Sequence, residues 1–96
     1  MYAVVRSYSG QGAAEVFDLV ESRAEDVTAL IGGVPGFVSY VAIRSGEGGM
    51  TVTVCEDEAG TDESSRRAAE FVKENLSTAV DPPAITSGST VLQIGA

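Results

Sequence analysis

The sequence predicts an α+β domain of the ferredoxin-like class, βαββαβ, with a four-stranded antiparallel sheet and both helices on one face. Two β-branched and aromatic runs flank the Gly-rich turn Gly46–Gly49 and predict a long hairpin between Pro35 and Asp57. A stretch with helical periodicity precedes this hairpin and another follows it, while strand-like stretches stand near both ends of the chain. The 96 residues are expected to form one domain, 1–96.

Residues 2–8 alternate with a period of two, which predicts the first strand. After the turn Gly10-Gln11-Gly12, apolar residues recur at helical spacing. This stripe consists of Ala13, Val16, Phe17, Val20, Ala24, Val27 and Ile31. The segment Ser22-Arg23-Ala24-Glu25 has the form of a capping box, so the region contains either two helices or, as the unbroken stripe favours, one. Gly32-Gly33 is predicted to end it, and Pro35-Gly36 to turn the chain into the hairpin.

A turn closed by residues 46–49 places Ile43 opposite Val52 and Arg44 opposite Thr51. Alternation then divides the hairpin into two faces. The mostly apolar face carries Ser39, Val41, Ile43, Ser45, Met50, Val52, Val54 and Glu56. The amphiphilic face carries Val38, Tyr40, Ala42, Arg44, Thr51, Thr53, Cys55 and Asp57.

The second helix is predicted to start near Thr61 or Asp62, whose oxygens suit the exposed amides of a first turn. Its expected buried stripe is Ser65, Ala68, Ala69, Val72 and Leu76, with Arg66, Arg67, Glu70, Lys73 and Glu74 outward. Asp81-Pro82-Pro83 stops any helix. Thr90–Ile94 is the predicted last strand.

The sheet face away from the helices is expected to carry the amphiphilic residues, together with Val4 and Tyr8 of the first strand. Left in water, they would form a large exposed apolar patch. A second copy is therefore predicted to cover them, so that a homodimer closes an α/β barrel. If the parity is inverted, the same residues face the helices instead.

Composition limits the partners. The chain has 14 Asp and Glu against 6 Lys and Arg, a net charge of -8, which argues against nucleic acid or an anionic membrane as a partner. Apolar runs stay well below the about 18 residues that a membrane span needs. The single cysteine, Cys55, excludes an internal disulfide, and the first residues do not resemble a secretory signal. A cytoplasmic location is expected.

The amphiphilic residues are also the candidate ligand site. A guanidinium beside phenols suits a phenolate, an enolate or a carboxylate, because a desolvated anion needs fixed donors. The predicted ligand-binding set is Arg6, Tyr8, Tyr40, Arg44, Thr53 and Cys55, with Phe71 of the second helix. The alternative interpretation is a dimer interface in which the arginines pair with acids of the partner.

Other chemistry is not expected. No histidine is present to activate Cys55, which is interpreted as a small buried hydrophobe, and Ser-His-Asp chemistry is excluded. The acidic run Glu56–Glu58 with Asp62 and Glu63 lacks calcium-loop spacing and is interpreted as solvated. Glu15 replaces the third glycine of a dinucleotide-binding pattern, so Gly10 and Gly12 are interpreted as turn residues. Neither a metal nor a cofactor is predicted.

Two segments, Pro35-Gly36-Phe37-Val38-Ser39-Tyr40 and Val54-Cys55-Glu56-Asp57, resemble the small dimeric α/β-barrel proteins of the antibiotic biosynthesis monooxygenase superfamily. The resemblance extends in element order over roughly residues 2–94. It implies a homodimer with a cavity between sheet and helices, which some members use for cofactor-independent oxidation of polyphenols and quinol-like compounds, or for haem breakdown.

The chain departs from that family at the residues that carry the chemistry. Oxygenases of the family use an asparagine on the first strand, a tryptophan, or a histidine on the second helix. This chain has no His and no Trp, and its one Asn is Asn75. No catalytic residue is therefore assigned by the resemblance.

Three functional hypotheses follow. The protein is an oxygenase-like enzyme that oxidises an aromatic or enolisable small molecule, or a non-catalytic dimer that binds a small apolar ligand or serves as an accessory or stress-related factor. The third hypothesis is a structural or interaction module.

Overall fold

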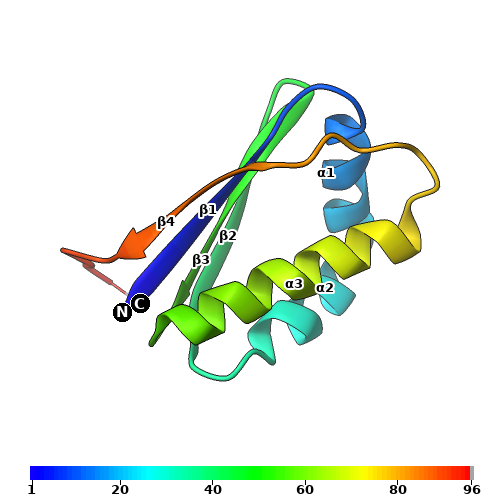
Figure 1. Ribbon diagram of the computed structural model, residues 1–96. Helices are drawn as coiled ribbons and strands as arrows, with labels where there is room; N and C mark the ends of the chain where they lie inside the picture. Colours follow the sequence, from blue (N-terminus) through cyan, green and yellow to red (C-terminus); the bar gives the residue numbers. More distant parts are fainter. Residues whose placement is uncertain (96) are drawn as a thin grey trace.

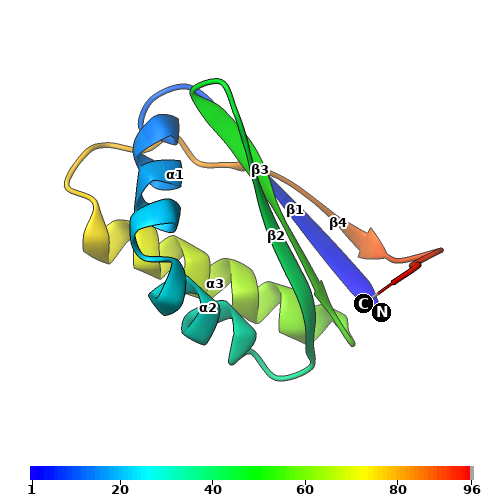
Figure 2. The same cartoon turned by 180° about the vertical axis from the view of Figure 1, so that it is seen from behind.

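A single antiparallel sheet covered on one face by helices forms the fold (Figures 1 and 2). The computed structural model describes residues 1–95. In this range the elements are β1 (Tyr2–Tyr8), α1 (Ala13–Ser22), α2 (Ala24–Gly32), β2 (Phe37–Ser45), β3 (Gly48–Cys55), α3 (Glu58–Asn75) and β4 (Ala84–Ser89). The strand order is β2-β3-β1-β4, and every neighbouring pair is antiparallel. The predicted ferredoxin-like class is confirmed.

The β2–β3 hairpin has a tighter turn than predicted. Ser45 pairs with Gly48, so only two residues close the turn, and Gly46 adopts the left-handed φ of 61° that such a turn favours. Ile43 consequently faces Met50 rather than Val52. This shift of two residues leaves the side chains from Ser39 to Ser45 on their predicted faces, because side chains alternate with a period of two. At the start of β2 the register shifts between Phe37 and Ser39, so the predicted alternation does not extend to Val38.

The first helical region is two helices, so the favoured continuous helix is wrong. Arg23, with φ −119° and ψ 35°, lies outside the helical region, and the chain changes direction there (Figure 2). The capping box suggested by Ser22 and Glu25 does not form, because the N-cap of α2 is Arg23 rather than Ser22 and no side chain caps the helix. Ser22 instead donates its hydroxyl to the Leu19 carbonyl, 3.2 Å away, which competes with the regular helix pattern. The bend lets both helices pack apolar residues on the sheet.

The helix α3 begins earlier than Thr61. Asp57 caps it by accepting a hydrogen bond from the Gly60 amide at 3.1 Å. Its most buried residues are Gly60, Thr61 and Ser64, whereas Ala69 of the predicted stripe is exposed. Small and hydroxyl-bearing residues therefore form its contact with the sheet.

The last strand is β4, not the predicted Thr90–Ile94. β4 pairs with β1 along its whole length, and the Thr90 amide donates to the Met1 carbonyl where β1 runs out. Residues 91–94 lie beyond the backbone that could pair with them, and Val91, Leu92 and Ile94 are exposed.

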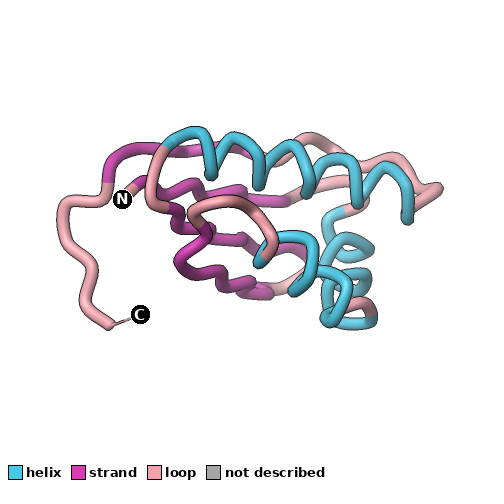
Figure 3. The backbone as a smooth tube through the Cα atoms, turned by 90° about the horizontal axis from the view of Figure 1, so that it is seen from below, coloured by secondary structure: helices cyan, strands magenta, loops and turns pink. Residues whose placement is uncertain are grey.

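The two faces of the sheet are the reverse of the favoured assignment and have the inverted parity that the sequence left open. The amphiphilic residues of β1, β2 and β3 point toward the helices, where Val4, Arg6 and Tyr8 are buried. The apolar residues of the alternate positions form the opposite face, which no helix covers (Figure 3). We call this surface the open face; it consists of Ala3, Val5, Val41, Ile43, Met50, Val52 and Val54. Polar residues point inward because they form the hydrogen-bonded group described below.

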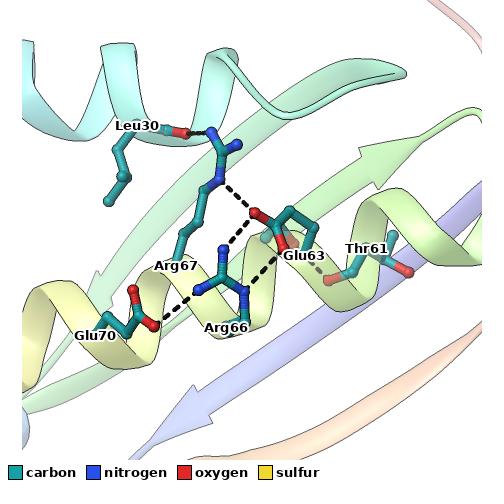
Figure 4. A network of polar contacts seen from close by, with 7 residues as sticks. Leu30, Thr61, Glu63, Arg66, Arg67 and Glu70 are labelled. Atoms are coloured by element: carbon teal, nitrogen blue, oxygen red, sulfur yellow. Dashed lines mark hydrogen bonds and ion pairs between the residues drawn. The ribbon is translucent and has the colours of Figure 1, made fainter.

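An ion-pair network joins α3 to α2 (Figure 4). Glu63 accepts hydrogen bonds from Arg66 at 2.6 Å and from Arg67 at 2.9 Å. Arg67, predicted to point outward, also donates to the Leu30 carbonyl of α2 at 2.9 Å. Arg67 therefore links the two helices while Glu63 orients it.

Glu63 is expected to make stability depend on acid pH. The hydrogen bonds from Arg66 and then Arg67 lower the pKa of Glu63 from 4.5 to about 2. A depressed folded pKa stabilises the protein above the unfolded pKa, and this stabilisation is lost as the pH falls toward 2. Urea unfolding of Glu63→Gln should therefore show a weaker loss of stability than the wild type between about pH 4.5 and pH 2. Glu25→Gln, an exposed acid on α2, is the control, and equal pH profiles for all three proteins would contradict the assignment.

Candidate functional site

A buried arginine on β1 forms the centre of the site. Arg6 is 2% exposed and lies between the sheet and α3. Its Nε donates to Thr51 Oγ1 at 3.2 Å and its Nη2 to Thr53 Oγ1 at 2.7 Å. Its Nη1 donates to the hydroxyls of Ser64 at 3.3 Å and Ser65 at 2.9 Å. Thr51 and Thr53 lie on the same face of β3, because side chains alternate along a strand, and Ser64 and Ser65 lie in the first half of α3.

All four acceptors are neutral hydroxyls. Within residues 1–95 no carboxylate forms an ion pair with Arg6. Burial lowers the pKa of Arg6, and the neighbouring Tyr8, Tyr40 and Cys55 oppose this shift. A guanidinium nevertheless stays protonated in proteins. The site therefore holds a buried positive charge without an internal counter-charge.

Two cavities adjoin this charge. The larger has a volume of about 430 Å³ and lies between β1, β4, α3 and the segment 76–83. Arg6 and Tyr8 form part of its wall, with Ser65, Ala69, Val72, Lys73, Leu76, Thr78, Val80, Asp81, Pro82, Pro83 and Ile85. The smaller, about 30 Å³, lies deeper under α1 and α2 and is also lined by Arg6 and Tyr8. The larger cavity has room for a multi-ring ligand.

Two tyrosines flank Arg6. Tyr8 is buried and packs edge-to-face on Phe17, with ring centroids 5.9 Å apart. Burial raises the pKa of Tyr8 and of Tyr40, while Arg6 opposes both shifts. Both phenols therefore stay protonated near neutral pH and remain able to donate a hydrogen bond. Of the two cavities beside Arg6, Tyr40 lines the smaller one.

The other predicted site residues have different surroundings. Thr53 holds Arg6 but lines neither cavity, and Phe71 lines the smaller cavity while the Arg23 guanidinium lies 5.7 Å from its ring centroid. Cys55 is fully buried, also outside both cavities, and burial raises the pKa of its thiol. The structure thus gives Cys55 the surroundings of a packed side chain.

Arg44 is not part of this group. Its guanidinium contacts Asp18 at 2.9 Å and Glu21 at 3.1 Å, both on α1. Arg44, the second arginine of the amphiphilic face, therefore connects β2 to α1 by ion pairs. Arg44 lines neither cavity.

Sequence reasoning missed the α3 hydroxyl of Ser64 and the cavity wall formed by segment 76–83. The one available signal was the serine pair Ser64-Ser65 at the start of an otherwise apolar helix stripe, where a buried hydroxyl needs a partner. Segment 76–83 shows no periodic pattern, so only the tertiary arrangement reveals its role.

The described residues present neither a metal-binding cluster nor a membrane helix. Between residues 1 and 95, no three His, Cys, Asp or Glu side chains are grouped so that they could hold a metal ion. No helix in the same range combines the length and apolar character needed to cross a membrane.

The fold and this site define a ferredoxin-like protein with a buried cationic centre beside a cavity. Solved structures with the same fold include a monooxygenase from the gene ActVA-Orf6 of Streptomyces coelicolor in complex with the ligand nanaomycin D. It is 24% identical with a TM-score of 0.65, over 99% of this chain and 91% of that one. A protein of unknown function from Nitrosomonas europaea is 19% identical with a TM-score of 0.67, over 99% and 93%.

A third similar structure is SnoaB, a cofactor-independent oxygenase from Streptomyces nogalater, which is 18% identical with a TM-score of 0.54 over 97% of this chain and 93% of that one. No protein-family model and no curated protein matches the chain. The solved structures alone therefore confirm the resemblance to the antibiotic biosynthesis monooxygenase-like proteins, and they confirm it at the level of the fold.

Proposed function

We propose that the protein is a homodimer that binds an aromatic or enolisable small molecule in the 430 Å³ cavity and oxidises it with molecular oxygen. The observation that carries this proposal is the cavity itself, in which apolar residues meet the buried Arg6 and the protonated Tyr8. The structural neighbours described as a monooxygenase with nanaomycin D and as a cofactor-independent oxygenase support it.

The open face supports the dimer. Val41 and Ile43 on β2 are 50% and 48% exposed, and Met50 beside them on β3 is 39% exposed. Neighbouring apolar side chains of this size are typical of an interface rather than of a wet surface. A two-fold arrangement of two open faces covers them without any further segment.

With an anthrone as the test substrate, the proposed reaction converts the anthrone and O₂ into an anthraquinone and water. The methylene group loses two hydrogen atoms and gains one oxygen atom to become a ketone, and the second oxygen atom of O₂ leaves with both hydrogens as water. Arg6 and Tyr8 contribute hydrogen-bond donors beside the carbonyl oxygen of the anthrone, which gains negative charge when the methylene group first loses a proton.

The test is oxygen consumption with anthrone as substrate, measured with and without added flavin. The expected result is one O₂ consumed and one quinone formed per anthrone above the spontaneous rate, without a flavin requirement. Arg6→Met and Tyr8→Phe should reduce this rate, whereas Arg44→Met, an arginine outside both cavities, should not. A rate equal to the spontaneous one, or unchanged by both cavity variants, would contradict the proposal.

A binding protein without catalysis is the second candidate, because the chain contains no His and no Trp. Calorimetry distinguishes the two functions. Tight binding of an anthrone or quinone without oxygen consumption supports the binding protein, and oxygen consumption supports the enzyme.

A further inference from the structure

We infer that the cavity takes its ligand as an anion, a phenolate or an enolate, and that Arg6 is the counter-charge. The inference uses the ligand site of the proposed function but not its oxidation step. It therefore applies equally to an enzyme and to a binding protein.

The hydrogen bonds of Arg6 leave its charge unbalanced. A guanidinium carries five N–H groups, and the four hydroxyls take one from Nε, two from Nη1 and one from Nη2. Within residues 1–95, the second N–H of Nη2 has no acceptor. Hydroxyl dipoles orient the guanidinium but carry no negative charge, and a buried charge is stabilised chiefly by an opposite one.

The titratable groups around Arg6 do not cancel its positive charge near neutral pH. From the sheet, Tyr8, Tyr40 and Cys55 are neutral, since burial raises the pKa of each. Lys73 of α3 adds a second positive charge to the wall of the larger cavity, and Asp81 is the one carboxylate among the described residues of this wall. The residues that α1 and α2 contribute to the smaller cavity are all apolar, so neither helix brings a charge to Arg6 there. The chain as a whole has a net charge of -8, so the positive charge of this cavity is a local feature of the site. A local positive charge favours the binding of an anion.

The remaining wall defines the body of the ligand. Ala69, Val72 and Leu76 of α3 line the cavity together with Val80 and Ile85. An apolar wall with one charged end suits a ligand that has an aromatic or conjugated body and one anionic oxygen. The oxygen of a phenolate or enolate is conjugated with such a body, so ionisation adds the charge without adding a hydrated substituent.

The test uses a monohydroxyanthraquinone, whose phenol and phenolate absorb at different wavelengths and whose rings are already oxidised. The expected result is that the wild type binds the phenolate about 10- to 100-fold more tightly than the phenol, as a charge-assisted hydrogen bond predicts. The bound dye should therefore ionise at a lower pH than the free dye. A bound dye that ionises at or above the pH of the free dye overturns the inference, whether or not any substrate is oxidised.

Two variants assign the effect to Arg6. Arg6→Met should abolish the preference for phenolate while changing the affinity for unsubstituted anthraquinone less than about twofold, and Arg44→Met should leave both affinities unchanged. If circular dichroism shows that Arg6→Met does not fold, Arg6→Lys should retain the preference for phenolate in reduced form, because it keeps the charge but not the planar fork. An unchanged preference in Arg6→Met contradicts the inference. So does tight binding of anthraquinone carboxylate without binding of the phenolate.

Discussion

The double variant Val41→Lys/Ile43→Lys should sediment as a folded monomer under conditions in which the wild type is a dimer. Both side chains lie on the open face of β2 and are about half exposed in one chain. In the proposed dimer they are buried, and two lysines per chain bring four like charges together at an apolar interface. Burying an unpaired charge costs several kcal/mol, so the dissociation constant should rise by more than about 100-fold.

Ile85→Lys is the matched control for this prediction. Ile85 is 56% exposed, similar to Ile43, but it lies at the cavity on the helix side of the sheet. This variant should remain dimeric. A wild type that sediments as a well-folded monomer at high micromolar concentration would refute the dimer, and so would a double variant that dimerises as tightly as the wild type.

Gly12→Ala is expected to be the most destabilising single methyl addition in the turn before α1. Gly12 has a left-handed φ of 80°, and a Cβ there would lie 2.6 Å from the Ala79 carbonyl oxygen and 2.8 Å from the Val80 Cα. The strain of a left-handed residue is about 1–2 kcal/mol, and overpacking against backbone adds about 1–3 kcal/mol. Urea unfolding should therefore show a loss of about 2–5 kcal/mol in the free energy of unfolding.

Gly46→Ala separates the two causes. Gly46 also has a left-handed φ, 61°, but nothing lies within 4 Å of the position that a Cβ would take there. It should lose only the strain, about 1–2 kcal/mol. Similar losses in both variants would show that the contact with segment 76–83 contributes nothing.

The order of elements was predictable because each element has a clear period. The alternation of residues 2–8 and the hairpin around Gly46 indicate strands from local sequence alone. The break at Arg23 was not predictable in the same way, because the apolar positions on both sides of it fit one continuous helix. The position of β4 is decided by pairing with β1 rather than by its own residues Ala84–Ser89, which include few strand-forming types.

The grouping of Arg6, Tyr8 and Tyr40 was also predictable, since strand alternation places them on one face. Which face meets the helices was not. An arginine and two threonines are residue types common on the outside of a sheet. Their inward position makes sense only once the hydroxyls of Ser64 and Ser65 complete the hydrogen bonds of Arg6. Alternation reports which residues share a side, whereas long-range packing decides what that side contacts.

The all-hydroxyl surroundings of Arg6 have a thermodynamic consequence. An aspartate in place of one of these hydroxyl residues would neutralise the guanidinium permanently and compete with any incoming anion. By using only uncharged acceptors, the chain leaves the neutralisation to a ligand, so that occupancy and resistance to heat are coupled. Molecules that fit the cavity can therefore be ranked by how far each raises the melting temperature, before any reaction is known.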